Sequence, residues 1–290
     1  MIYTEHKDVQ SFLSVTQSTL ERNESANGLM LGICLRLARE PNAYGSKAYM
    51  ATIESNQSLL LAALMTPPYK LQLYLENDQD TAGYERLVDE LLRGGWTVPG
   101  VLARESAGKK FASIWCSRRR GSFREGMRQR VHELRQVEHP VYPSGEFRSA
   151  DINDVELAQS WAYGFHDECF EDNMYQQTVN AVENIVKKGE LFFWVDGGPR
   201  SMAGMIRPTP NGKAVSYVFT PKKDRSKGYA SAVVARVSQR ILDSGKKFCT
   251  LYTDLSNPTS NSIYRKIGYR GVADVIDIFF ESNSNNNELK

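Results

Sequence analysis

The sequence predicts an α/β (α+β) fold built from two related modules, each a mixed, mostly antiparallel twisted sheet flanked by helices. The chain has 290 residues, which at about 150 residues per domain suggests two domains. Segments with helical apolar spacing alternate with short strand-like runs along its whole length. Both halves also share one order of elements: helix, hairpin, strand ended by Thr-Pro, helix and strand. Thr66-Pro67 and Thr220-Pro221 mark the corresponding strand ends, so the sequence indicates a tandem repeat of one fold.

The composition predicts a globular protein without a membrane or nucleic-acid partner. Apolar residues make up 41% of the chain and charged residues 24%, which is enough for a packed core. The net charge of +2 gives no reason to expect binding to nucleic acid or to a membrane surface. No apolar run reaches the ~18 residues of a membrane span, and the N-terminus lacks the pattern of a secretory signal. We therefore expect a cytoplasmic protein.

The four cysteines predict neither a metal site nor a disulfide framework. Cys34, Cys116, Cys169 and Cys249 are widely scattered, and the sequence contains no Cys-x-x-Cys or Cys/His cluster. In the cytoplasm such thiols stay reduced, and we expect no bound metal.

The first half of the chain carries the elements of the first module. Residues 81–93 illustrate the argument, because Tyr84, Leu87 and Leu91 fall on one helical face and Gly94 follows as a stop signal. In order, we expect a helix over 9–22, a helix or strand over 28–37, a hairpin of 48–53 and 59–65, a strand over 71–75, the helix over 81–93, a strand over 98–103, a helix capped by Ser106, and a strand over 127–137.

A stretch rich in proline and glycine, residues 139–145, separates the modules. We place the first module at 1–140, a linker at 141–144, the second module at 145–281, and a polar, disordered tail at 282–290. The second module is expected to contain a strand at 146–148, a helix over 152–162, an acidic and aromatic loop at 165–172, a helix over 175–188, a hairpin of 191–195 and 202–206, and strands over 214–220 and 248–253.

A tight glycine turn opens onto a helix in the second module. The run Arg225-Ser226-Lys227-Gly228-Tyr229-Ala230 follows a strand and precedes an apolar stripe that includes Val233 and Val237. Gly228 allows a tight turn with close backbone approach, and the free N–H groups of a helix N-terminus attract an anion. Arg225 and Lys227 add positive charge. The alternative is a plain strand-to-helix turn with solvated cations; the strand-turn-helix context favours the anion site.

A second polar segment follows the next strand. Asn257, Ser260, Asn261 and Tyr264 lie at i, i+3, i+4 and i+7, so they share one helical face. Thr259 or Ser260 is expected to cap this helix. A phenol on this face can donate a proton into a cleft. The alternative for Tyr264 is an aromatic side chain that packs with its hydroxyl bonded to the backbone.

Together these segments resemble the GNAT superfamily of acetyl-CoA-dependent N-acyltransferases over roughly residues 145–280. The glycine turn matches the family's pyrophosphate loop, R/Q-x-x-G-x-G/A. Residues 257–269 match its pattern N-x-x-S/A-x-x-L/I-Y-x-K-x-G-F/Y. Gly145-Glu146-Phe147-Arg148 followed by Asp151 looks like the family's first strand and helix.

The resemblance implies a role for each matched segment. The strand at 218–220 would pair with the pantetheine arm of acetyl-CoA, and the glycine turn would hold the pyrophosphate. Tyr264 would protonate the departing CoA thiolate, while a backbone N–H of the Val218 strand would stabilise the oxyanion. The implied cofactor-binding residues are Val218, Phe219, Thr220, Arg225, Ser226, Lys227, Gly228, Tyr229, Ala230, Asn257, Asn261 and Tyr264.

The general base is the feature that the resemblance does not supply. The family often places a glutamate on or near the central strand, whereas residues 214–217 contain none. Water, or Glu168, Glu171 or Asp172 in the acidic loop, would then accept the proton. These carboxylates can equally attract a cationic amine or lie solvated.

The first module looks like a degenerate copy without a cofactor loop. Asp78 and Asp80 stand where the glycine turn would be, and their charges would repel a phosphate. We therefore expect one cofactor per chain and a first module that shapes the acceptor site or an interface; a homodimer stays open.

The expected function is N-acetyl transfer from acetyl-CoA to a primary amine of a small molecule or peptide, by direct attack of the amine. The alternative is a non-catalytic acyl-CoA-binding or interaction module that keeps the fold. The missing base favours the alternative, and the retained Tyr264 favours the enzyme.

Overall fold

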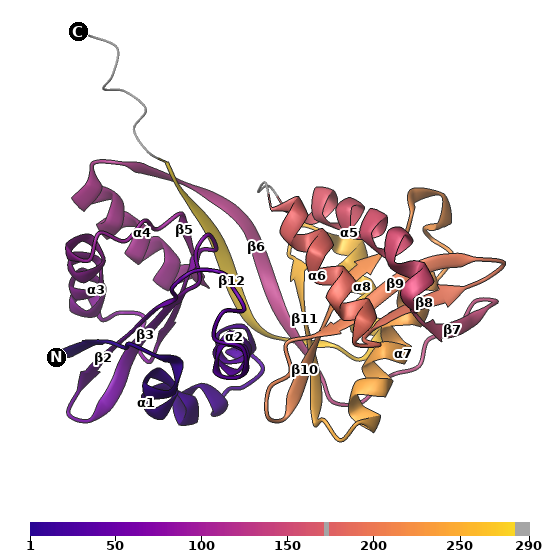
Figure 1. Cartoon of the computed structure of the whole chain (residues 1–290), viewed down its shortest axis with the longest axis horizontal. Coiled ribbons are helices and arrows are strands. Elements are labelled where there is room, and N and C mark those ends of the chain that lie inside the picture. Colours follow the sequence, from indigo (N-terminus) through magenta and orange to yellow (C-terminus); the bar gives the residue numbers. More distant parts are fainter. Residues whose placement is uncertain (171–173, 282–290) are drawn as a thin grey trace, which may run out of the picture. The chain divides into compact units, whose positions relative to one another are not determined.

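The computed structural model describes residues 1–170 and 174–281, and the chain forms two compact units (Figure 1). Of the described residues, unit 1 comprises Met1–Val131, Asp254–Ser256 and residues 272–281, while unit 2 comprises those of His132–Thr253 and Asn257–Gly271. The expected tail at 282–290 lies outside the described residues. In the part of the chain that is described, no helix has the length and apolar character needed to cross a membrane.

Unit 1 contains five complete strands, most of two further strands, and four helices of the described chain. Its elements are β1 (Ile2–Glu5), α1 (Val9–Glu21), α2 (Gly28–Arg39), β2 (Tyr49–Ser55), β3 (Ser58–Met65), β4 (Leu71–Leu75), α3 (Thr81–Arg93), β5 (Gly100–Arg104), α4 (Glu105–Arg119), most of β6 (Ser122–Leu134) and most of β12 (Arg270–Glu281). The strands β1 to β4 pair antiparallel in sequence, β4 pairs parallel with β5, and β5 pairs antiparallel with β12.

Unit 2 repeats this topology. Its elements are β7 (Glu146–Ser149), α5 (Val155–Cys169), α6 (Tyr175–Lys187), β8 (Leu191–Val195), β9 (Pro199–Ile206), β10 (Gly212–Phe219), α7 (Tyr229–Asp243), β11 (Phe248–Asp254) and α8 (Pro258–Ile267), with short 3-10 turns at Ile152–Asp154 and Lys222–Asp224. The strands β7 to β10 pair antiparallel in sequence, and β10 pairs parallel with β11. Three antiparallel pairs followed by a parallel one occur in both units, which confirms the predicted tandem of mixed, mostly antiparallel sheets.

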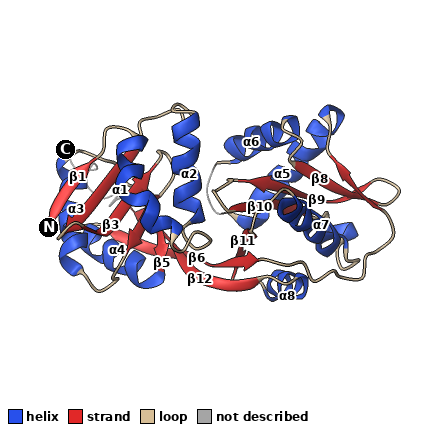
Figure 2. Ribbon diagram, turned by 90° about the horizontal axis from the view of Figure 1, so that it is seen from below, coloured by secondary structure: helices blue, strands red, loops and turns tan. Residues whose placement is uncertain are grey.

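Helices cover both faces of each sheet because each sheet has apolar side chains on both faces. In unit 1, α3 and α4 pack on one face through residues such as Leu87 and Phe111, while α1 and α2 pack on the other through Phe12 and Leu31. In unit 2, α7 covers one face and α5 with α6 covers the other (Figure 2). Val233, Val234, Val237 and Ile241 of α7 are fully buried, as their spacing predicted.

The structure corrects the expected domain boundaries in three places. Residues 132–140 belong to unit 2, whereas Asp254–Ser256 and residues 272–281 belong to unit 1. The reason is packing: Ile276 and Ile278 of β12 are buried in the core of unit 1, whereas Leu134 and Val137 are buried in the core of unit 2. Each half of the chain therefore contributes its last strand segment to the other unit.

Four local expectations also change. The ambiguous run at 28–37 is helix α2. Residues 165–169, expected in a loop, form the last turns of α5, and Glu171 and Asp172 lie outside the described residues. Ser106 does not cap α4, because that helix begins at Glu105. The cap of α8 is Asn257, whose side-chain oxygen accepts a hydrogen bond from the Ser260 N–H at 3.1 Å.

Candidate active site

The parallel strands β10 and β11 separate part of the way along unit 2. They pair only from Gly212 to Ala214, opposite residues 248–250, although β10 continues to Phe219 and β11 to Asp254. On the β9 side, a bulge sets Tyr217 and Val218 against a single residue, and Tyr217 has a φ of +54°. Bulges bend a strand, so this one accounts for the divergence. Beyond Ala214 the β11-facing edge of β10 has no paired strand among the described residues, and a ligand backbone can use it.

The glycine turn stands at the end of this strand, at the N-terminus of α7. Gly228 is the N-cap with a φ of +85°, and Ser226 has a φ of +62°. Among the described residues no side chain caps this helix. A Cβ placed on Gly228 would have its nearest neighbour, an atom of Pro143, at 3.8 Å. The open helix N-terminus therefore leaves room and backbone donors for an anion.

The carboxylates of Asp224 and Asp196 hold residues of the glycine turn in place. Asp224 is buried, and its Oδ1 lies 3.4 Å from both Arg200 Nη1 and Lys227 Nζ. Asp196 Oδ2 accepts hydrogen bonds from Tyr229 Oη at 2.6 Å and from Ser144 Oγ at 2.7 Å. The bond from Tyr229 is the main reason that the pKa of Asp196 is lowered. This support could not be predicted from the sequence, because it comes from the β8–β9 turn and from the stretch expected to be a linker.

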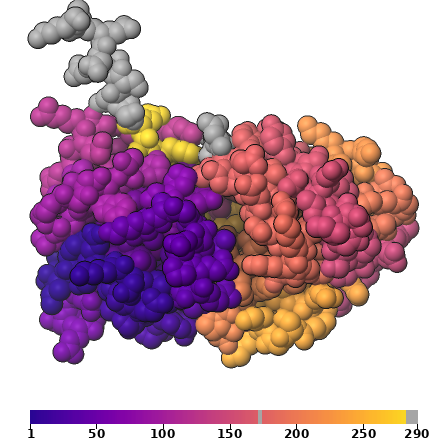
Figure 3. All heavy atoms as spheres, viewed as in Figure 1, coloured from indigo at the N-terminus to yellow at the C-terminus, as the bar shows by residue number. Residues whose placement is uncertain are grey.

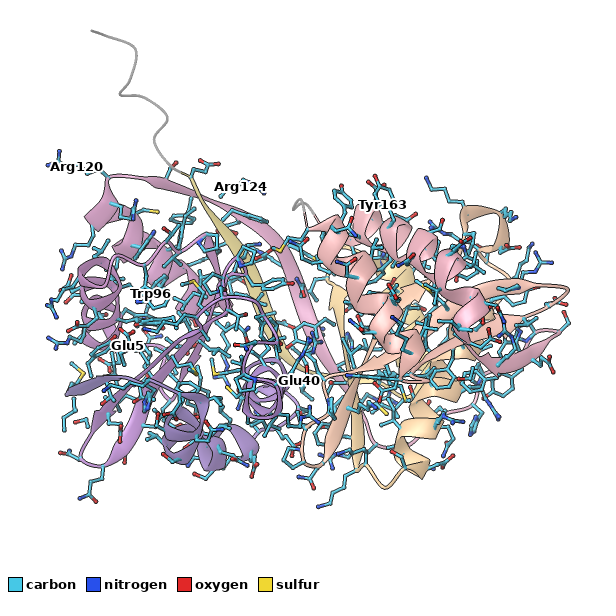
Figure 4. All side chains as sticks on the ribbon, viewed as in Figure 1. Glu5, Glu40, Trp96, Arg120, Arg124 and Tyr163 are labelled. Atoms are coloured by element: carbon cyan, nitrogen blue, oxygen red, sulfur yellow. The ribbon has the colours of Figure 1, made fainter. Side chains whose placement is uncertain are left out.

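Glu168 is bound to the glycine turn. Its Oε1 and Oε2 accept hydrogen bonds from Arg225 Nη2 at 2.6 and 2.7 Å, and Arg225 Nε donates to the Thr220 carbonyl at 2.9 Å. Glu168 lies near the end of α5, the helix that also carries the exposed Tyr163 (Figure 4). A substrate amine would have to displace a guanidinium to reach this carboxylate. The geometry thus assigns Glu168 to Arg225, and the expected role as base has no support from its position.

The first turn of α8 is fixed by a chain of side-chain hydrogen bonds. Asn261 Nδ2 donates to the Asn257 carbonyl at 2.8 Å, and its Oδ1 accepts from Thr253 Oγ1 at 2.7 Å. Thr253 Oγ1 in turn lies 3.1 Å from Nε2 of the buried His132. Asn261 therefore holds α8 against β11. The Nδ2 group of Asn257 donates no hydrogen bond to the described residues and can serve a ligand.

Tyr264 lies one turn beyond Asn261 on the same helix. Its ring packs edge-on against that of the buried Tyr269, with centroids 6.0 Å apart. Its hydroxyl makes no hydrogen bond to any residue in the described ranges, unlike the Tyr269 hydroxyl, which lies 2.8 Å from Ser238 Oγ. Desolvation raises the pKa of Tyr264, and the nearby Cys169 thiol contributes in the same direction. The alternative of a hydroxyl bonded to the backbone does not hold.

Unit 1 lacks an open helix N-terminus at the corresponding place. Asp80 is the N-cap of α3, and its Oδ1 accepts a hydrogen bond from the Gly83 N–H at 3.3 Å. An open cavity of about 330 Å³ there is lined by Leu60, Asn77, Gln79 and Asp80. A carboxylate already occupies the position that an incoming phosphate would need.

The structure thus brings the expected site residues together in unit 2: the separated end of β10, the turn at Gly228, and the α8 face with Asn257 and Tyr264. Ranges 1–170 and 174–281 contain no group of three or more His, Cys, Asp and Glu residues that could hold a metal ion. Unit 2 thus offers an open helix N-terminus for an anion, an unpaired strand edge and a phenol.

Known proteins share this architecture. Residues 195–275 match the family model described as FR47-like protein. A Drosophila protein solved in a structural genomics programme aligns with a TM-score of 0.68 at 12% identity, covering 98% of this chain and 99% of its own. A tandem GNAT protein from the clavulanic acid biosynthesis pathway gives 0.58 at 9% identity and covers 99% of both chains. An acetyltransferase from the GNAT family of Colwellia psychrerythraea aligns with a TM-score of 0.55 at 12% sequence identity. The alignment covers 97% of this chain and 100% of the Colwellia chain. No curated protein matches the chain.

The chain therefore has the GNAT N-acetyltransferase fold in tandem. Most of the FR47-like segment, residues 195–275, lies in its second unit.

Proposed function

We propose that unit 2 transfers an acetyl group from acetyl-CoA to a primary amine by direct attack. The observation that carries the proposal is the separation of β10 from β11 after Ala214, in the unit that also holds the open turn at Gly228 and the Tyr264 hydroxyl, which bonds no described residue. Acetyl-CoA, the acyl donor, supplies an activated thioester. A protein that binds it needs donors for its phosphates, a strand edge for its amide-containing arm, and a proton donor for its sulfur.

Each part of unit 2 has a matching task in this proposal. The N–H groups around Gly228, with Lys227 beside them, hold the pyrophosphate. The free edge of β10 at 218–220 pairs with the pantetheine arm, and Asn257 Nδ2 donates to it. The Val218 N–H stabilises negative charge on the carbonyl oxygen.

Tyr264 acts as the general acid. The amine nitrogen forms a bond to the carbonyl carbon, the carbon–sulfur bond breaks, and the phenol gives its proton to the leaving thiolate. A raised pKa keeps the phenol protonated at neutral pH, which is the state that an acid requires. The proton lost by the amine goes to water or to Glu171 or Asp172, because Glu168 is held by Arg225.

The single site per chain follows from the contrast between the two units. The α7 N-terminus is open to an anion, whereas Asp80 caps the α3 N-terminus with its own carboxylate. We therefore assign acetyl-CoA to unit 2 alone.

The test compares CoA release from acetyl-CoA over a panel of primary amines, with the wild type and Tyr264→Phe. The phenylalanine variant keeps the ring contact with Tyr269 and loses only the proton donor, so kcat is expected to fall roughly 100-fold or more. If CoA binds but no amine supports turnover, the protein is an acyl-CoA-binding module, and the enzyme proposal is wrong.

A further inference from the structure

Arg207 is a partly buried arginine that has no carboxylate partner among the described residues. The other partly buried arginines, Arg130, Arg148 and Arg200, each bond a carboxylate, at 2.7, 2.7 and 3.4 Å. A guanidinium that has lost part of its water shell and has no counter-ion in the described part of the chain is a binding group for an added anion.

The backbone at Arg207 is held in an unusual conformation. Arg207 directly follows β9 and has a φ of +45°, a left-handed value that a residue with a Cβ seldom adopts. Such strained positions are concentrated at functional sites, where the surrounding structure enforces them. The Cζ of Arg207 lies 5.8 Å from the ring centre of Tyr252.

Tyr252 places this cation beside the separated part of β11. It lies two residues beyond Thr250, the last residue of β11 that pairs with β10, and so roughly 7 Å along the separated part of the strand. Residues two apart share a face of a strand, and the intervening Leu251 packs in the core under α7. Tyr252 and Arg207 therefore lie on the opposite face, where α5 and α6 pack; these helices form part of the surface seen in Figure 3.

The Tyr252 hydroxyl adds a donor beside the guanidinium. It makes no hydrogen bond to the residues that the structure describes, and burial raises its pKa, so that it stays a neutral donor. An arginine fork and a phenol suit a carboxylate, which carries one negative charge. Lys213, the nearest cation along β10, is bound to Glu190 at 2.5 Å, so it is not available for the second charge of a phosphate.

We propose that the acceptor is an amine that carries a carboxylate, such as an amino acid, and that Arg207 and Tyr252 bind this carboxylate. The inference rests on the proposed function, because it assigns the acceptor of the same reaction. Binding the carboxylate beside β11 directs the amine toward the separated end of β10. Arg207 is thus a specificity-determining residue.

The test measures kcat/KM for amino acids from glycine to phenylalanine and for the matching amino acid amides. An amide has the more readily deprotonated amine, since the carboxylate that stabilises the ammonium is gone. Amine reactivity alone would therefore favour the amides, whereas we expect the amino acids to be better by about 10- to 100-fold, as for a charged hydrogen bond. In Arg207→Gln the preference for amino acids over amides should vanish, because kcat/KM falls for the amino acids and stays the same for the amides. Arg207→Lys should restore part of the preference.

Arg240→Gln is the matched control. Arg240 also lies over an aromatic ring, that of Phe192 at 5.2 Å, but on the α7 side of the sheet. Arg240→Gln should leave the preference for amino acids over their amides unchanged. Equilibrium dialysis of radiolabelled amino acids in the presence of CoA adds a readout without turnover, and Arg207→Gln should abolish the retained label.

The outcomes separate the two proposals. Turnover with amines but equal use of acids and amides, unaffected by Arg207→Gln, overturns this inference and leaves the acetyltransferase intact. A better rate with O-phosphoethanolamine than with every amino acid also overturns it. Turnover with no amine at all contradicts the proposed function, and dialysis then decides whether the carboxylate site exists.

Discussion

Both carboxylate oxygens of Glu168 accept a hydrogen bond from Nη2 of Arg225, at 2.6 and 2.7 Å. This pair joins the last turn of α5 to the turn that precedes α7. In the proposed function the pyrophosphate lies at that turn, so the cofactor and Glu168 compete for one guanidinium. The pair is 40% and 37% exposed, and its strength is accordingly modest.

Replacing Glu168 by Gln should therefore tighten cofactor binding without harming chemistry. An exposed ion pair contributes about 0.2–1 kcal/mol, so the Kd for CoA is expected to fall by up to roughly fivefold. Because Arg225 already occupies the carboxylate, kcat should stay within about threefold. Binding is measured by calorimetry and kcat by CoA release at saturating substrates.

Asp167→Asn is the control for the charge change. Asp167 is the exposed neighbour of Glu168 and forms no ion pair within the described chain. Asp167→Asn should change neither the Kd for CoA nor kcat. If Glu168→Gln instead lowers kcat by roughly 100-fold, the loss typical of a general base, then Glu168 is the base and our assignment of it to Arg225 is wrong.

The pH dependence of kcat should show no alkaline fall caused by Tyr264. Burial raises the pKa of this phenol above its ordinary value of 10.0, and an acid remains active at every pH below its own pKa. We expect kcat to hold from neutral pH up to about pH 10. An alkaline fall with an apparent pKa below 10 that disappears in Tyr264→Phe would refute the raised pKa.

The C-terminal end of α8 should be intolerant of any Cβ. Gly268 has a φ of +112°, and a Cβ there would lie 2.7 Å from the Gln136 carbonyl oxygen. Gly268→Ala combines this clash with the cost of about 1–2 kcal/mol for a left-handed conformation. We expect thermal denaturation to show a loss of more than about 2 kcal/mol in the free energy of unfolding.

Gly189→Ala separates the two contributions. Gly189 also has a positive φ, +66°, but a Cβ there would meet no atom within 4 Å. This variant should lose only about 1 kcal/mol. Equal losses of unfolding free energy in both variants would show that the segment at Gln136 moves to accommodate the methyl group. That segment would then not fix the end of α8.

Local patterns were sufficient to predict most elements of the fold. The helix over 81–93 and the strands over 71–75 and 191–195 have the predicted bounds, because apolar spacing and stop residues act within one element. The exchange of end strands was not predictable in this way. Ile276 and Ile278 alternate as they would in any sheet, and the choice of partner depends on residues far away in the sequence.

The candidate site shows the same limit. The glycine turn and the face with Asn257 and Tyr264 could be found from the sequence, since each is one continuous segment; their roles stay predictions. The partner of Glu168 and the lack of a carboxylate partner for Arg207 in ranges 1–170 and 174–281 could not, because both depend on side chains brought together by folding. The bulge at Tyr217 has no glycine to mark it.

Calorimetric titration with CoA tests the central claim, that each chain holds one cofactor at the α7 N-terminus. The wild type should bind one equivalent, and Gly228→Asp should bind none, because it adds a side chain and a negative charge where the pyrophosphate lies. Gly245→Asp is the control, since Gly245 has a similar φ of +89° and open surroundings at the other end of α7. Two equivalents per wild-type chain, or unchanged affinity in Gly228→Asp, would contradict the assignment.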